Sequence, residues 1–218
     1  MKRKNGLTNI SAARATATVF GILAGLGGLV HGIGEVLQGN VTAKGFFVNS
    51  WTQGPIATNM GGEPGLTIVP NLLVTGILTI IVSLTIVIWA AVFVQRKYGG
   101  WILVFLSIVM LLTGGGIAPP IMGILAGIAG FGVGAPLTWW RKHLSVNPRH
   151  FLGRLWSWIF GIAVINGIFL VIGSLILVYF FDFNNPNLFT FSFLFAVVCL
   201  LLMIFTGRAY DIQSDQEI

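Results

Sequence analysis

The stretch ARATATVFGILAGLGGLVHGIGEVL, residues 13–37, decides the fold. It is apolar and long enough for a helix that crosses the hydrocarbon core of a bilayer, which takes about 20 residues. Alternating steps of three and four positions place a set of small residues and one carboxylate on a single helical face. The members of this set are Thr18, Gly21, Gly25, Gly28, Gly32, Glu35 and Gly39. The four glycines from Gly21 to Gly32 on this face predict a groove into which another membrane helix packs its backbone.

The composition places the rest of the chain in a membrane as well. Of 218 residues, 56% are hydrophobic and only 8% are charged, whereas soluble domains carry about 25% charged residues. The single cysteine, Cys199, excludes a disulfide within the chain and a cysteine-based zinc motif. We therefore expect an all-α polytopic membrane protein with no cofactor and no metal.

Apolar runs predict six transmembrane helices in one membrane domain. Their ranges are 13–37, 68–94, 100–113, 121–135, 155–181 and 188–205, which gives three-helix halves at 1–116 and 117–218. We predict no regular structure for the polar loop 38–66, because its glycines and prolines mark turns. The run GGGIAPP, residues 114–120, predicts a sharp turn between two short helices. These two helices form either a tight spanning hairpin or a re-entrant one buried in protein.

The placement of basic residues predicts the topology. If six helices alternate across the bilayer, eleven Lys and Arg residues lie on the side of the N-terminus and only Lys44 lies on the other. This bias predicts that both termini are cytoplasmic, in a cell (plasma) membrane. The basic residues 2–4 before an apolar run resemble a signal peptide, but the run is long and no cleavage site closes it, so we expect a retained helix. The basic loop 141–154 is expected to meet anionic lipid rather than nucleic acid.

Two segments suggest an internal repeat. The sequence GILAG occurs at 21–25 and again at 123–127, and the glycine spacing of the first run recurs in the second. The recurring glycines are Gly123, Gly127, Gly130 and Gly134. Because each copy has three helices, a duplication predicts a 3+3 inverted repeat of the kind seen in secondary transporters. The alternative is that apolar, glycine-rich segments match by chance.

Candidate site residues centre on the outer end of the first helix. Glu35 and His31 lie four positions apart, within side-chain reach on one helix. A carboxylate at this depth is either functional or paired, and the alternative is that it reaches the outer interface. Glu63 and Asp182 are polar residues that could join it from the outer loops, and Asn71 and Asn166 are candidate lining residues.

These features favour two functions. The first is a small transporter or channel-like protein for a small solute or ion, with the candidate residues at its outer approach. The second is a non-catalytic membrane subunit or scaffold that binds partner helices through its glycine faces, in a homo-oligomer or with other membrane subunits. The sequence has no HExxH zinc motif, Walker motif or nucleophile motif, and we do not expect an enzyme.

Overall fold

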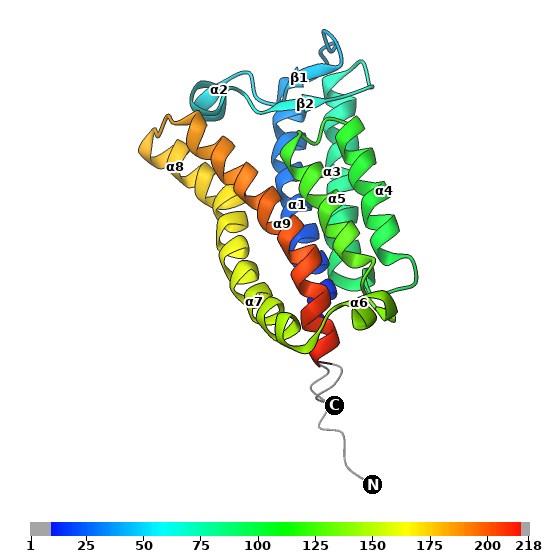
Figure 1. Cartoon of the computed structure of the whole chain (residues 1–218). Helices are drawn as coiled ribbons and strands as arrows, with labels where there is room; N and C mark the ends of the chain where they lie inside the picture. The colour runs from blue at the N-terminus through cyan, green and yellow to red at the C-terminus, as the bar shows by residue number, and fades with distance from the viewer. Residues whose placement is uncertain (1–9, 215–218) are drawn as a thin grey trace.

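The computed structural model describes residues 10–214 and shows an all-α membrane protein (Figure 1). Four helical segments are long and apolar enough to cross a membrane. The first two are α1 (Ala12–Gln38) and α3 (Leu72–Ile88), and α3 ends in the π-helix η1 (Trp89–Phe93). The third is α7 (Val146–Ile168), which continues through the π-helix η2 (Phe169–Gly173) into α8 (Ser174–Phe181). The fourth is α9 (Pro186–Ser214). Two shorter apolar helices, α4 (Gly99–Leu112) and α5 (Ala118–Gly130), form the predicted hairpin.

The helix α1 lies between its neighbours α3 and α5 and runs antiparallel to both. Gly32 faces Gly76 near the start of α3, and Gly21 faces Ala90 near its end. On the other side, Gly27 lies beside Pro119 at the start of α5, and Ala17 lies beside its last residue. The α4–α5 hairpin therefore extends along α1 for most of the length of the bundle.

Glycines allow these helices to approach closely. A Cβ atom added at Gly25 would lie 2.6 Å from Cγ2 of Val87, and one at Gly76 would lie 2.6 Å from the carbonyl oxygen of Gly32. Such distances are shorter than real Cβ contacts, so only glycine permits this separation between α1 and α3. The glycine face of α1 is thus covered by the protein's own α3.

The contacts do not support the three-helix repeat. In α1 the glycine face packs on the next apolar helix in the chain, α3. Its proposed counterpart α5 packs Gly123 against Ser107 and Gly127 against Val104, which lie on the preceding helix α4. Gly134 lies beyond α5, where an added Cβ atom would meet nothing within 4 Å. The shared glycine spacing therefore reflects the same close-packing requirement in two different helix pairs.

The helices α7 to α9 form a second hairpin that begins and ends further into the polar segments than expected. The helix α7 starts at Val146 rather than at residue 155, and α9 continues to Ser214 rather than ending near 205. The extra turns of α9 are stabilised by tertiary contacts, because the carboxylate of Asp211 accepts hydrogen bonds from the backbone N–H groups of Ala12 and Ala13. These are orphan donors at the start of α1, which a carboxylate satisfies well.

One end of the bundle is rich in basic residues. The helix α1 begins there, η1 ends there, and the short helix α6 (Thr138–His143) leads into α7 (Figure 1). The basic residues in these segments and at the end of α9 are Arg14, Arg96, Lys97, Arg141, Lys142, Arg149, Arg154 and Arg208. Lys2, Arg3 and Lys4 lie outside the described residues.

The polar loop at the opposite end has regular structure that sequence patterns did not indicate. It contains β1 (Phe47–Asn49), the short helix α2 (Gly54–Met60) and β2 (Pro64–Leu66), and the two strands pair antiparallel. The segment after β2 bonds to the tip of the α4–α5 hairpin, where the N–H of Ile68 donates to the carbonyl of Leu112 over 3.0 Å. We name residues 39–71 the outer layer. It covers the ends of α1 and the hairpin (Figure 1).

Candidate functional site

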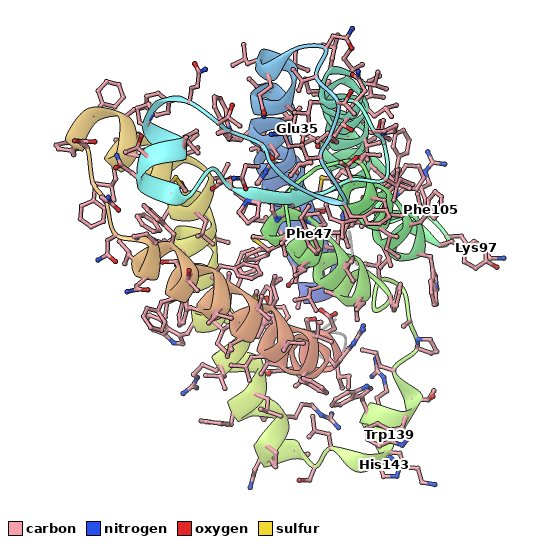
Figure 2. The ribbon with its side chains drawn as sticks, turned by 90° about the horizontal axis from the view of Figure 1, so that it is seen from above. Glu35, Phe47, Lys97, Phe105, Trp139 and His143 are labelled. Carbon is pink, nitrogen blue, oxygen red and sulfur yellow. The ribbon has the colours of Figure 1, made fainter. Side chains whose placement is uncertain are left out.

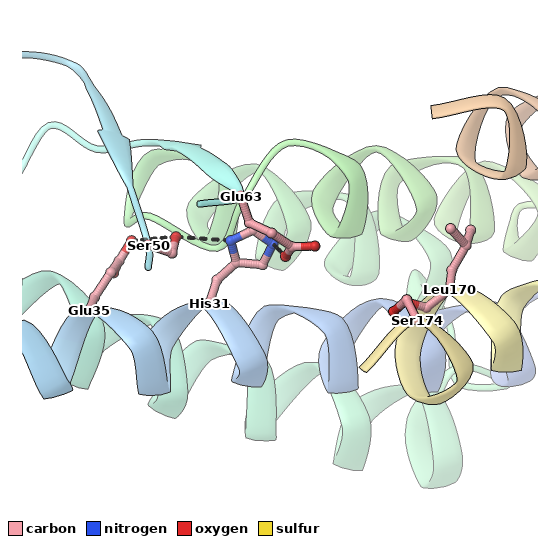
Figure 3. Close-up of polar contacts among 6 residues, drawn as sticks. All are labelled: His31, Glu35, Ser50, Glu63, Leu170 and Ser174. Atoms are coloured by element: carbon pink, nitrogen blue, oxygen red, sulfur yellow. Dashed lines mark hydrogen bonds and ion pairs between the residues drawn. The ribbon is translucent and has the colours of Figure 1, made fainter. Parts of the chain in front are cut away.

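Four polar side chains form a chain of contacts where α1 meets the outer layer (Figure 3). The hydroxyl of Ser50 donates to Oε1 of Glu35 over 3.3 Å and lies 2.9 Å from Nδ1 of His31. The other ring nitrogen of His31, Nε2, lies 2.9 Å from Oε2 of Glu63. We name Glu35, Ser50, His31 and Glu63 the polar cluster. Two of its members come from α1 and two from the outer layer.

Solvent exposure increases along the polar cluster from Glu35 to Glu63. Glu35 and Ser50 are fully buried, and the side chains of His31 and Glu63 are 6% and 24% exposed. Burial by itself raises the pKa of Glu63, but the charge of His31 and its hydrogen bond outweigh burial and hold the pKa below its ordinary value. The cluster thus connects a buried carboxyl group to a partly exposed, ionised one.

The turn at 114–116 makes room for this cluster. Gly114 has φ +101° and Gly116 has φ +78°, both in the left-handed region that favours glycine. A Cβ atom at Gly114 would overlap both carboxyl oxygens of Glu35, and one at Gly116 would overlap the ring of His31. The sequence pattern indicated only a sharp turn at these glycines. Their contact with the polar cluster is a second reason why no larger residue fits.

A partly enclosed pocket of about 350 Å³ lies beside the polar cluster. Its walls come from α1, the start of α5, the η2–α8 segment and the start of α9, and residues 60–64 of the outer layer close one end. Most of the lining is apolar, and among residues 10–214 only His31 and Glu63 contribute titratable side chains to it. Ser174 lies on the π-helical side of the wall, where its hydroxyl donates to the carbonyl of Leu170 over 2.7 Å. Irregular π-turns of this kind often occur at functional sites.

The structure brings three of the six predicted site residues together: His31, Glu35 and Glu63. The other three lie elsewhere. Asn71 caps α3 by accepting from the N–H of Val74. Asn166 donates to the carbonyl of Ser192 and so ties α7 to α9. Asp182 accepts from Asn59 over 2.7 Å, which joins the end of α8 to α2.

Sequence reasoning missed Ser50, which bridges the two predicted residues of α1. Nothing in its local sequence signals this role, because the outer layer brings it to α1 across a loop. The other two described histidines lie away from the polar cluster. His150 is exposed on α7. His143 stacks on Trp139 with the ring centroids 4.6 Å apart, and both lie on α6, well apart from Glu35 when the molecule is seen from above (Figure 2).

The polar cluster resembles a nucleophile with a histidine and an acid, but its geometry does not suit covalent catalysis. Ser50 is fully buried and does not line the pocket, so a substrate there has no access to its hydroxyl. In residues 10–214 no group of three or more His, Cys, Asp or Glu is placed to hold a metal ion. What the arrangement offers is a polar end, formed by His31 and Glu63, to an otherwise apolar pocket.

No protein-family model, curated protein or solved structure matches this chain.

Proposed function

We propose that this protein is a small membrane transporter that takes an amphipathic solute into the pocket beside the polar cluster. The observation that carries the proposal is the ion pair of His31 and Glu63 at one end of an otherwise apolar pocket of about 350 Å³. Ligand pockets combine apolar walls with a few polar groups that fix orientation. Ionisable groups held at membrane depth are rare and mark substrate or proton paths.

The position of the pocket supports transport rather than simple binding. It lies where the α7–α9 hairpin diverges from α1 and α5. Further along the bundle the same elements are close-packed, with Phe20, Ala163 and Leu200 fully buried. A pocket open on one side of a packed barrier is the arrangement that alternating access requires. In this proposal the α7–α9 hairpin rocks against the other helices, and both termini are cytoplasmic with the pocket facing outward.

The scaffold alternative is less well supported. It requires glycine faces that remain free to bind partner helices. The faces of α1 and α5 are instead filled by α3 and α4, as the contacts of Gly25 and Gly127 illustrate.

The test is uptake of labelled amphipathic solutes by proteoliposomes, with a variant that fills the pocket and a matched control. Thr190 lines the pocket, is exposed, and donates its hydroxyl to the carbonyl four residues earlier. Thr85 is also exposed and makes the same type of bond, but it lies on α3 away from the pocket.

Thr190→Trp is expected to abolish protein-dependent uptake, whereas Thr85→Trp should leave it unchanged. Equal uptake by both variants would show that the transported solute does not pass through this pocket. Absence of uptake for the whole solute panel, with wild-type protein that elutes as a single folded species, would contradict transport.

A further inference from the structure

We propose that α2 is a lid over the outer end of the pocket, and that the hydrogen bond between Asn59 and Asp182 holds this lid closed. The proposal rests on the proposed function, because it concerns how access to the same pocket is regulated. It follows from the position of α2 between two separately anchored parts of the molecule, from the glycines at its ends and from its shallow burial.

The chain that follows α2 is fixed to α1. The side chain of Glu63 pairs with His31 over 2.9 Å, and the backbone carbonyl of Glu63 accepts from the N–H of Ser50 over 3.2 Å. The carbonyl of Gly62 accepts from the N–H of Trp51 over 2.9 Å. These two backbone bonds continue the pairing of β1 with β2. Residues 62–63 are therefore part of a strand pair that is held on α1.

On its other side α2 is attached to the α7–α9 hairpin. It contacts α8 and α9 at their outer ends (Figure 1). Nδ2 of Asn59 donates to Oδ1 of Asp182, the residue that caps α8, over 2.7 Å. Thr58, the other polar side chain of α2, bonds within the helix to the carbonyl of Gly54. The bond between Asn59 and Asp182 is thus the polar contact that joins α2 to the hairpin proposed to move.

Glycines at both ends of α2 permit it to rotate. Gly54 has φ +80° and Gly61 has φ +70°, and a Cβ atom added at either glycine would meet nothing within 4 Å. The backbone can therefore change its φ and ψ angles at both positions without a clash. Hinges of moving lids are often a few residues of this kind at the ends of an element.

The shallow burial of α2 makes its release inexpensive. Of its seven described residues, Ile56 and Asn59 are the buried ones. Segments with few buried apolar side chains open locally at a low free energy. Met60, the last residue of α2, lines the pocket. Rotation of α2 away from α8 would therefore open this end of the pocket.

The backbone of Asp182 provides a test that does not depend on destabilising the fold. Its φ of +48° lies in the left-handed region, which glycine adopts at lower cost than aspartate. The aspartate instead supplies the acceptor for Asn59. Asp182→Gly removes this acceptor while it favours the local backbone, whereas Asp182→Asn keeps an oxygen acceptor.

The first experiment measures the distance between spin labels by electron paramagnetic resonance, with the full chain in nanodiscs. The labels are attached through Thr58→Cys on α2 and Asn187→Cys on α9, two exposed positions, in a Cys199→Ala background. Asn59→Ala and Asp182→Gly should each lengthen the mean distance by about 5 Å, half the length of a helix of this size.

Two control variants should keep the wild-type distance. Asp182→Asn should keep it because the acceptor for Asn59 remains. Asn40→Ala should also keep it, because it removes a side-chain bond of 2.6 Å to Asn71 elsewhere in the outer layer.

The second experiment measures whether uptake requires the lid to open. Asn59→Cys and Asp182→Cys, combined in the Cys199→Ala background, are joined by a short bifunctional methanethiosulfonate. This cross-link should abolish the uptake of amphipathic solutes by proteoliposomes, and dithiothreitol should restore it. The same reagent on Asn40→Cys combined with Asn71→Cys should leave uptake unchanged.

The outcomes separate the lid from the proposed function. Unchanged label distances in both Asn59→Ala and Asp182→Gly would overturn the lid, and so would undiminished uptake with the cross-link to Asp182→Cys in place. Either result would leave the pocket as the transport site. Absence of uptake by wild-type protein would contradict transport instead, and the label distances would then still decide whether α2 opens.

Discussion

The substitution Gly114→Ala tests whether the turn at 114–116 is shaped by the polar cluster. The added methyl group meets two obstacles. The backbone at Gly114 has φ +101°, which costs a non-glycine residue about 1–3 kcal/mol. The new Cβ also overlaps the carboxyl group of Glu35 and Cγ2 of Thr75, and overpacking of this kind costs about 1–3 kcal/mol. We expect a total loss of about 3 kcal/mol in the free energy of unfolding.

A control substitution shows the cost of a positive φ without the overlap, and the double-mutant cycle below then isolates the overlap. Gly61 also has positive φ, at +70°, but nothing lies within 4 Å of its added Cβ. Gly61→Ala should therefore cost only the backbone term, about 1 kcal/mol. For a chain of this size each kcal/mol lowers the melting temperature by roughly 2–4 °C. In detergent, Gly114→Ala should melt about 6–12 °C below wild type, and Gly61→Ala about 2–4 °C below it.

A double-mutant cycle identifies the side chain responsible. Glu35→Ala removes the carboxyl group that the new methyl group overlaps. Combined with Gly114→Ala it should destabilise by at least about 1 kcal/mol less than the sum of the two single changes. Equal melting temperatures for Gly114→Ala and Gly61→Ala, or strictly additive effects in the cycle, would refute the proposed contact between this turn and Glu35.

Three further predictions follow from particular contacts. Ser50→Ala removes the bridge between two buried groups, so it should lower the free energy of unfolding by about 1–3 kcal/mol, measured by thermal unfolding; a neutral result would mean that the bridge contributes nothing. Glu63 has a folded-state pKa below its ordinary value of 4.5, so its stabilising contribution is present above that pH and lost as the pH falls through the folded pKa. The melting temperature should therefore fall more steeply below pH 4.5 in wild type than in Glu63→Gln, and parallel curves would argue against the ion pair. Asp211→Ala should cost about 1–2 kcal/mol because it leaves two N–H groups at the start of α1 without their acceptor, and hydrogen exchange at those amides should rise, whereas unchanged exchange would show that they have other partners.

The membrane class and the presence of close-packed helix faces follow from local patterns in the sequence. Apolar runs of sufficient length indicate helices in lipid wherever they lie, and the glycine spacing of α1 indicates a close neighbour. The spacing does not identify that neighbour. It is α3 for Gly25 and α4 for Gly127, and this difference removes the support for the inverted repeat. Likewise α4 and α5 are shorter than a full span, and the number of helices that cross the bilayer remains a prediction.

What the sequence by itself determined was the lipid environment, the glycine faces and the placement of His31 and Glu35 within reach of each other on one helix, because hydrophobicity and helical period are local properties. Only the tertiary structure decided how these two residues are paired. Ser50 and Glu63 contact the α1 residues from the outer layer. Gly114 and Gly116 in the hairpin turn lack the side chains that would overlap Glu35 and His31. None of these contacts has a sequence period, because they join segments whose approach is set by the packing of α1, α4 and α5. The pocket belongs to the same class of property, since its walls come from four separate elements that meet only in the folded chain.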